Sequence, residues 1–198
     1  MATLAPPSAI LHAPAHLRAL HTPARQEIVD TLDAAGPCSV ARLAELIGRP
    51  ADSLYHHLRR LVRVGLVVEE RHKEGRHVFA IYRLQVRPLK LRYERPACSA
   101  DVVGVVGAAH RLAWREFRRA MGRGDAITSG PRRTLWGARA KGWLSPDELE
   151  RVNRLLGEVI ELLRAGTPAR GRVPVSASFL LAPSPPGVRA IRSKGRVG

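Results

Sequence analysis

Residues 39–65 have the sequence SVARLAELIGRPADSLYHHLRRLVRVG, and this stretch decides the fold of the first half of the chain. Ser39 is a favourable N-cap, and the apolar residues that follow it recur at helical spacing until Gly48 stops the pattern. Pro50 then opens another helix after a short turn. The stretch therefore predicts two helices held across a tight turn.

The second of these helices is amphipathic. Leu54, Leu58 and Leu61 form one apolar stripe that we expect to face the core, and Gly65 supplies the left-handed stop. The outward positions carry short hydrogen-bonding groups near the helix start and cations near its end: Asp52, Ser53, Tyr55, His56, Arg59, Arg60 and Arg63. Such a face fits the major groove of duplex DNA, with short groups near base edges and arginines near phosphates.

The residues before this stretch predict one more helix. Thr22 places a hydroxyl ahead of Pro23, and the sequence Gly36-Pro37 is a stop signal. We therefore expect a first helix over residues 23–35.

The residues after it predict a β-hairpin. LVVEER and HVFAIYRL are β-branched and aromatic runs separated by the charged tip His72-Lys73-Glu74-Gly75-Arg76. Three helices followed by a hairpin is the order of a winged helix-turn-helix. In that arrangement Lys73 and Arg76 contact the DNA backbone or minor groove beside the main site.

The run SVARLAELIGRPADSLYHHLRRLVRVGLVVEERHKEGRHVFAIYRL resembles the ArsR-like winged helix-turn-helix regulators, and the likeness covers residues 22–84. Its most specific part is SLYHHLRRL, followed by a Gly-Leu-Val strand start and a basic hairpin. The resemblance implies a dimeric repressor or activator on a palindromic site. The metal-sensing branch carries a cysteine pair on its DNA-contacting helix, whereas RPADSLYHH has none, so metal sensing of that kind is not expected.

Two longer helices are predicted in the second half, over residues 100–121 and after the capping box Ser145-Pro146-Asp147-Glu148. The segment GWLSPDELERVNRLL is similar to helical C-terminal extensions of uncharacterised members of the same family. Its helix carries the seam pattern of paired helices at Leu149, Val152, Leu156, Val159 and Leu163. We expect this seam to join two subunits, with packing inside one subunit as the alternative.

Four aromatic residues in this half are candidates for a small-molecule effector pocket: Trp114, Phe117, Trp136 and Trp143. The alternative is that they are core residues.

These patterns divide the chain into four parts and predict a mainly α fold with a small β wing. The parts are an Ala/Pro-rich arm (1–21), a winged helix-turn-helix (22–90), a helical dimerisation or effector region (91–166), and a strand-like segment with a basic, partly disordered tail (167–198).

The charge balance favours a polyanionic partner. The chain has 33 Lys and Arg against 17 Asp and Glu, a formal net charge of +16. Arginine supplies most of this excess, so a codon bias toward GC-rich triplets explains part of it. Cys38 and Cys98 are too few for a disulfide scaffold and match no metal spacing, so we expect no metal or cofactor and a reducing cytoplasm. We expect neither a signal peptide nor a membrane span.

The sequence as a whole predicts a DNA-binding transcriptional regulator, specific for its site, that acts as a homodimeric repressor on double-stranded DNA. It contains no GxSxG, HExxH or P-loop motif, so we do not expect an enzyme. Two alternatives remain: a protein-interaction adaptor that uses a winged-helix module, and a nonspecific nucleoid-associated DNA binder.

Overall fold

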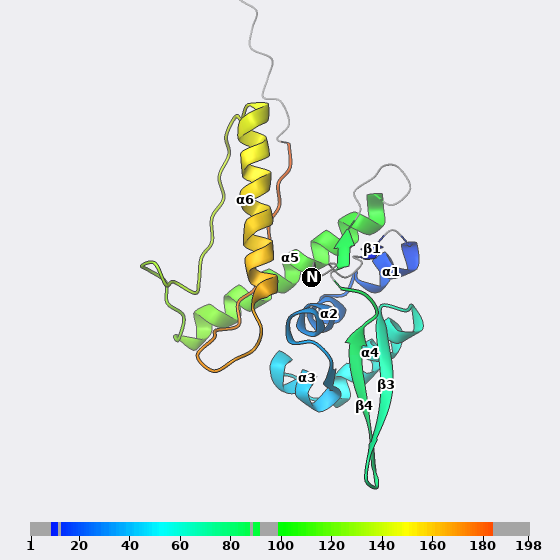
Figure 1. Cartoon of the computed structure of the whole chain (residues 1–198). Coiled ribbons are helices and arrows are strands. Elements are labelled where there is room, and N and C mark those ends of the chain that lie inside the picture. Colours follow the sequence, from blue (N-terminus) through cyan, green and yellow to red (C-terminus); the bar gives the residue numbers. More distant parts are fainter. Residues whose placement is uncertain (1–8, 12, 88, 92–98, 184–198) are drawn as a thin grey trace, which may run out of the picture.

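The computed structural model describes residues 9–11, 13–87, 89–91 and 99–183 (Figure 1). These residues form a winged helix-turn-helix with a small antiparallel sheet, followed by a helical C-terminal region, so the predicted fold class is confirmed. The elements are β1 (Ala9–Leu11), α1 (Pro14–Ala19), α2 (Pro23–Ala35), β2 (Cys38–Ser39), α3 (Val40–Ile47), α4 (Asp52–Arg63), β3 (Val67–Glu74), β4 (His77–Leu84), β5 (Leu89–Leu91), α5 (Ser99–Arg123) and α6 (Pro146–Ala165). None of the described helices is both long and apolar enough to cross a membrane.

The helix-turn-helix forms where the capping signals predicted it. The Ser39 hydroxyl accepts a hydrogen bond from the backbone N–H of Arg42, which satisfies one of the free donors at the start of α3. Gly48 ends α3 with a left-handed φ of 70°. The leucine stripe of α4 is buried as expected, with Leu54, Leu58 and Leu61 each at most 1% exposed.

The wing is longer than the sequence indicated. The β3–β4 pairing continues to Glu74 opposite His77, so His72 and Lys73 lie within β3 and the tip is reduced to Gly75-Arg76. The sequence predicted these charged residues as a loop. They can belong to the strands because the hydrogen bonds between paired strands join backbone groups and do not involve the side chains. A two-residue tip with Gly75 at φ 59° matches the twist of the paired strands.

The sheet has a third strand that the sequence did not reveal. β2 pairs antiparallel with β4, with Cys38 opposite Tyr82. Two residues are too few to show the alternation by which a strand is recognised. Cys38 is buried, and this burial raises the pKa of its thiol.

Much of the predicted N-terminal arm is part of the folded unit. The backbone of β1 pairs in parallel with β5, and Leu17, Ala19 and Leu20 are buried in the same core as α4. Pro14 fits this structure, because it occupies the first position of α1, where no backbone donor is needed.

The first half of α5 closes the core of the winged helix-turn-helix, although the sequence assigned this helix to a separate region from residue 91. Val102 and Val105 belong to the core cluster, whereas Val103 is 70% exposed. Gly104 allows the close approach of His21, because a Cβ at this position would lie 2.6 Å from the His21 Nε2 atom.

Residues 113–183 have a different character, because none of them is buried. Figure 1 shows α6 standing away from the winged-helix unit, flanked by the extended segments that precede and follow it. The predicted capping box is present, with Ser145 and Glu148 each bonded to the other's backbone. The strand-like segment of the predicted tail includes residues 173–182, which form no paired strand in the structure. We call residues 124–183 the C-terminal arm.

Candidate nucleic-acid interface

The outward face of α4 is not covered by any other described part of the chain. Opposite the buried leucines, six of the seven predicted α4 residues are exposed and Ser53 is partly exposed; the six are Asp52, Tyr55, His56, Arg59, Arg60 and Arg63. The surface that the sequence assigned to DNA is therefore accessible, and the C-terminal arm does not cover it.

Polar contacts fix α4 at both ends. Just before its start, the Nη2 atom of Arg49 lies 2.8 Å from the Oε2 atom of Glu27 on α2. At its end, the His16 ring on α1 lies 2.7 Å from the carbonyl oxygen of Val64, the C-cap residue. A helix held at both ends presents its outward side chains in a fixed geometry, which is what recognition of a groove requires.

Glu27 also ties α5 to this arrangement. Its side chain is only 9% exposed, and its carboxylate accepts a hydrogen bond from Arg115 at 3.0 Å. The same carboxylate forms ion pairs with Arg119 at 3.9 Å and with Arg49. The sequence analysis missed this cluster, because residues 88 positions apart carry no local signal of their contact.

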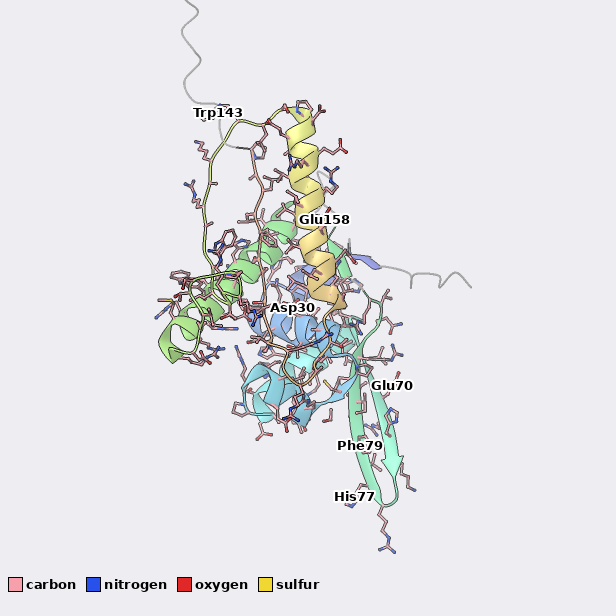
Figure 2. The ribbon with its side chains drawn as sticks, turned by 60° about the vertical axis from the view of Figure 1, so that its left-hand side comes forward. Asp30, Glu70, His77, Phe79, Trp143 and Glu158 are labelled. Atoms are coloured by element: carbon pink, nitrogen blue, oxygen red, sulfur yellow. The ribbon has the colours of Figure 1, made fainter. Side chains whose placement is uncertain are left out.

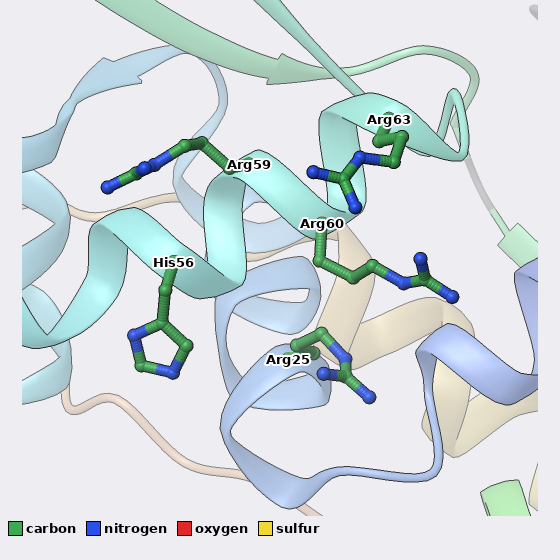
Figure 3. Close-up of a pocket in the computed structure, with 5 residues that line it drawn as sticks. All are labelled: Arg25, His56, Arg59, Arg60 and Arg63. Carbon is green, nitrogen blue, oxygen red and sulfur yellow. The ribbon is translucent and has the colours of Figure 1, made fainter.

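Five cationic or titratable side chains line a concavity of about 360 Å³ on this face: Arg25, His56, Arg59, Arg60 and Arg63 (Figure 3). Arg25 comes from α2 and was not predicted. Burial, and then the positive charge of Arg60, lower the pKa of Arg25. None of the described residues that line the concavity is acidic. Crowded guanidinium groups without a carboxylate match the charge and geometry of a DNA phosphate.

The two adjacent histidines of α4 have different surroundings. His56 is exposed and faces the concavity, whereas His57 is partly buried, and its Nδ1 atom has no hydrogen-bond partner among the described residues. Burial, followed by the charges of His56, Arg25 and Arg49, lowers the pKa of His57 to about 4. The lowered pKa favours the neutral form of His57 at pH 7, whereas His56 is exposed on the concavity.

Ser53, near the start of α4, is already engaged on one side. Its hydroxyl donates a hydrogen bond to the Pro50 carbonyl at 2.7 Å. The lone pairs of the oxygen remain available to accept a bond from a base amino group.

The wing presents its cations at the outer end. Lys73 in β3 and Arg76 at the tip are both exposed. Glu70 lies nearer the base, where a hydrogen bond from Arg83 lowers the pKa of its carboxyl. Glu74 lies at the end of β3 beside the tip, so the outer end of the wing carries the two cations together with one acidic residue.

The predicted effector-pocket residues are only partly brought together. Trp114 and Phe117 stack with ring centroids 5.9 Å apart. Trp114 lines an open cavity of about 430 Å³ with three arginines, Arg115, Arg118 and Arg119. Trp136 and Trp143 do not line this cavity, and Trp143 is 92% exposed near the start of α6 (Figure 2). None of the four aromatic residues is buried within the chain.

The predicted seam residues all lie on α6 and are not buried within the chain. Leu149 and Val159 are exposed, and Val152, Leu156 and Leu163 are partly exposed. Packing inside one subunit therefore does not bury this seam, and Leu155 and Leu162 beside it are more exposed still.

Asp30 on α2 is a further titratable group near α5 (Figure 2). The residue keeps access to solvent, yet the dense protein around it and the carboxylates of Glu116, Asp33 and Glu27 raise its pKa to about 7.

Comparison with known proteins agrees with the geometry of α3 and α4. Residues 19–70 match the family model described as "Helix-turn-helix domain". This part of the chain is a helix-turn-helix domain. The ArsR-like subtype is a finer assignment that this match does not address. No curated protein matches the sequence significantly.

Three solved structures are similar in part. BpsR of Bordetella bronchiseptica, whose DNA binding is regulated by 6-hydroxynicotinic acid, is 16% identical over 74% of this chain and 92% of its own, with a TM-score of 0.32. RV1404 of Mycobacterium tuberculosis is 18% identical over 75% of this chain and 80% of its own, with a TM-score of 0.29. MepR, a transcription regulator of the Staphylococcus aureus multidrug efflux pump MepA, is 14% identical over 71% of this chain and 78% of its own, with a TM-score of 0.27. All three TM-scores are below 0.5.

Proposed function

We propose that this protein is a transcriptional regulator that binds specific duplex DNA sequences through α4 and the wing. The observation that carries the proposal is the accessible cationic face of α4, which is fixed at both ends and lies in a matched helix-turn-helix domain. In this proposal Arg25, Arg59, Arg60 and Arg63 contact phosphates, while Ser53, Tyr55 and His56 contact base edges.

The proposal includes a homodimer that acts as a repressor in the cytoplasm. A single winged helix buries too little DNA for high specificity, and a two-fold dimer places two recognition helices about one helical turn of DNA apart. The unburied seam of α6 supports an interface with a second copy. Repression follows when the bound dimer occupies the site that polymerase needs. The protein acts by binding rather than by catalysis, and the open cavity beside Trp114 is the candidate site for an effector.

Selection of bound duplexes from a random pool tests this function directly. We expect the full-length protein to enrich one two-fold symmetric sequence. It should bind that sequence at least about 10³-fold more tightly than a scrambled duplex at physiological salt. Equal affinity for selected and scrambled duplexes would instead support a nonspecific nucleoid binder, and enrichment of nothing would favour a protein-interaction adaptor.

Two substitutions in α4 separate phosphate contacts from base contacts. Arg60→Ala should weaken binding to selected and scrambled duplexes alike and reduce the salt slope by about 1 per site. His56→Ala should cost about 1–3 kcal/mol on the selected duplex alone. Arg132→Ala, an exposed arginine of the C-terminal arm, is the matched control and should change neither. The division of roles fails when His56→Ala and Arg60→Ala lose affinity for both duplexes equally.

A further inference from the structure

The C-terminal arm and the second half of α5 expose many large apolar side chains. No residue from 113 to 183 is buried, and exposed large apolar side chains occur along the whole stretch. Most of the stability of a helix in a protein comes from packing its apolar face, and large exposed apolar patches mark interaction sites. The 20 residues of α6 therefore require a partner that the described part of a single chain does not supply.

The exposed edge of α6 has a distinct composition. Leu155 and Leu162, 50% and 76% exposed, lie two turns apart on the same edge of the apolar face. Glu158 follows Leu155 by three positions and precedes Leu162 by four, so it flanks both leucines on the helix surface (Figure 2). This edge thus combines apolar side chains with a negative charge.

The second half of α5 carries the complementary pattern. Trp114 and Met121, 62% and 58% exposed, lie two turns apart, and Arg118 follows Trp114 by four positions. Arg111 continues this outward ridge one turn earlier and is also exposed. The ridge therefore combines apolar side chains with positive charge.

The net charges of the two helices decide between the available pairings. α6 holds five acidic residues and three arginines, a net charge of −2, whereas residues 111–123 hold five arginines and one glutamate, a net charge of +4. Pairing α6 with α6 would bring two negative helices together. Pairing α6 with this part of α5 brings opposite charges together around apolar side chains, the arrangement that suppresses wrong partners.

We propose that the partner is a second copy of this chain and that the two copies exchange their α6 helices. The α6 helix of each copy packs on the outward ridge of α5 of the other, with the edge around Glu158 against the edge around Arg118. The exchange rests on the proposed homodimer and specifies how it is built. A two-fold arrangement makes the two contacts identical and covers both arms. The cavity beside Trp114 then lies at the subunit interface.

Charge reversal in separate chains tests the exchange. Glu158→Arg and Arg118→Glu should each weaken the full-length dimer about tenfold, because each replaces two attractive contacts by two repulsive ones. In a mixed dimer of the two variants, one contact joins the new arginine to the new glutamate and the other keeps native Glu158 and Arg118. An equimolar mixture should therefore recover the wild-type dissociation constant within about threefold.

Sedimentation velocity over a concentration series measures these dissociation constants, and circular dichroism verifies that each variant is folded. Leu162→Asp should also dissociate the dimer, whereas Leu46→Asp, on an exposed leucine of α3, is the matched control and should not. A mixture that stays as dissociated as its components, or single variants that keep wild-type affinity, would overturn the exchange. A wild-type chain that stays monomeric would overturn both the exchange and the proposed homodimer, while the duplex selection decides DNA recognition separately.

Discussion

Substitution of Glu27 by glutamine tests whether the carboxylate that joins α2, α5 and the approach to α4 stabilises the fold. The side chain is 9% exposed and faces Arg49, Arg115 and Arg119 at 2.8, 3.0 and 3.9 Å. Glutamine preserves the shape but removes the charge, and it leaves three guanidinium groups facing a neutral amide. The Nε atoms of Arg49 and Arg115 are buried and have no hydrogen-bond partner among the described residues. No other described acceptor therefore compensates these two arginines when the Glu27 carboxylate is removed.

The expected loss follows from the burial of the partners. Removal of one member of a fully buried ion pair costs about 3–5 kcal/mol. The side chains of Arg49 and Arg115 are 23% and 33% exposed, so water screens part of the remaining repulsion. We expect Glu27→Gln to lower the free energy of unfolding by about 2–3 kcal/mol. For a chain of this size that loss lowers the Tm by about 4–12 °C.

Urea denaturation followed by circular dichroism measures this difference. Glu45→Gln is the matched control, because Glu45 pairs with Arg42 at 2.9 Å on the exposed surface of α3. Surface pairs of this kind contribute about 0.3–0.5 kcal/mol. If the two variants unfold within about 0.5 kcal/mol of each other, the three arginines do not depend on Glu27 and the reasoning is refuted.

Two further predictions concern packing and protonation. Gly104→Ala should lower the free energy of unfolding by about 1–3 kcal/mol, because the new Cβ displaces the His21 ring. Gly157→Ala is the control on open helix surface and should raise the Tm slightly. Equal changes in the Tm of the two variants would contradict the close contact between Gly104 and His21. The pKa of His57 is lowered to about 4 from 6.5, so as pH falls through this window the unfolded chain takes up a proton first and stability declines. His57→Phe should flatten the stability profile between these two pH values, and an unchanged slope would count against a buried neutral imidazole.

The helix-turn-helix could be predicted because its determinants are local. Ser39 and Gly48 bound α3 through caps that depend on one or two residues, and the leucine stripe of α4 fixes which face is buried. The outward face of α4 follows from the same periodicity. For this reason the predicted DNA-contacting residues of α4 were accessible as expected.

The parts that were missed depend on contacts between distant residues. Arg25 joins the cationic concavity only because α2 packs beside α4, and Glu27 meets Arg115 across 88 positions. The pairing of β1 with β5 and the short β2 strand likewise depend on segments far apart in the sequence. Neither hydrophobic periodicity nor capping carries information about such distances.

The sequence alone determined the bounds of α2, where α3 and α6 begin, which face of α4 is apolar, and that this chain carries excess positive charge. These properties follow from backbone hydrogen bonding, side-chain periodicity and composition, which act over a few residues. Only the tertiary structure decided that α1 and the first half of α5 complete the core, that Arg25 joins the α4 face, and that the C-terminal arm has no buried side chain. Burial is a property of the whole packed chain, and the same apolar helix pattern describes a helix that is covered by its own chain and one that is not.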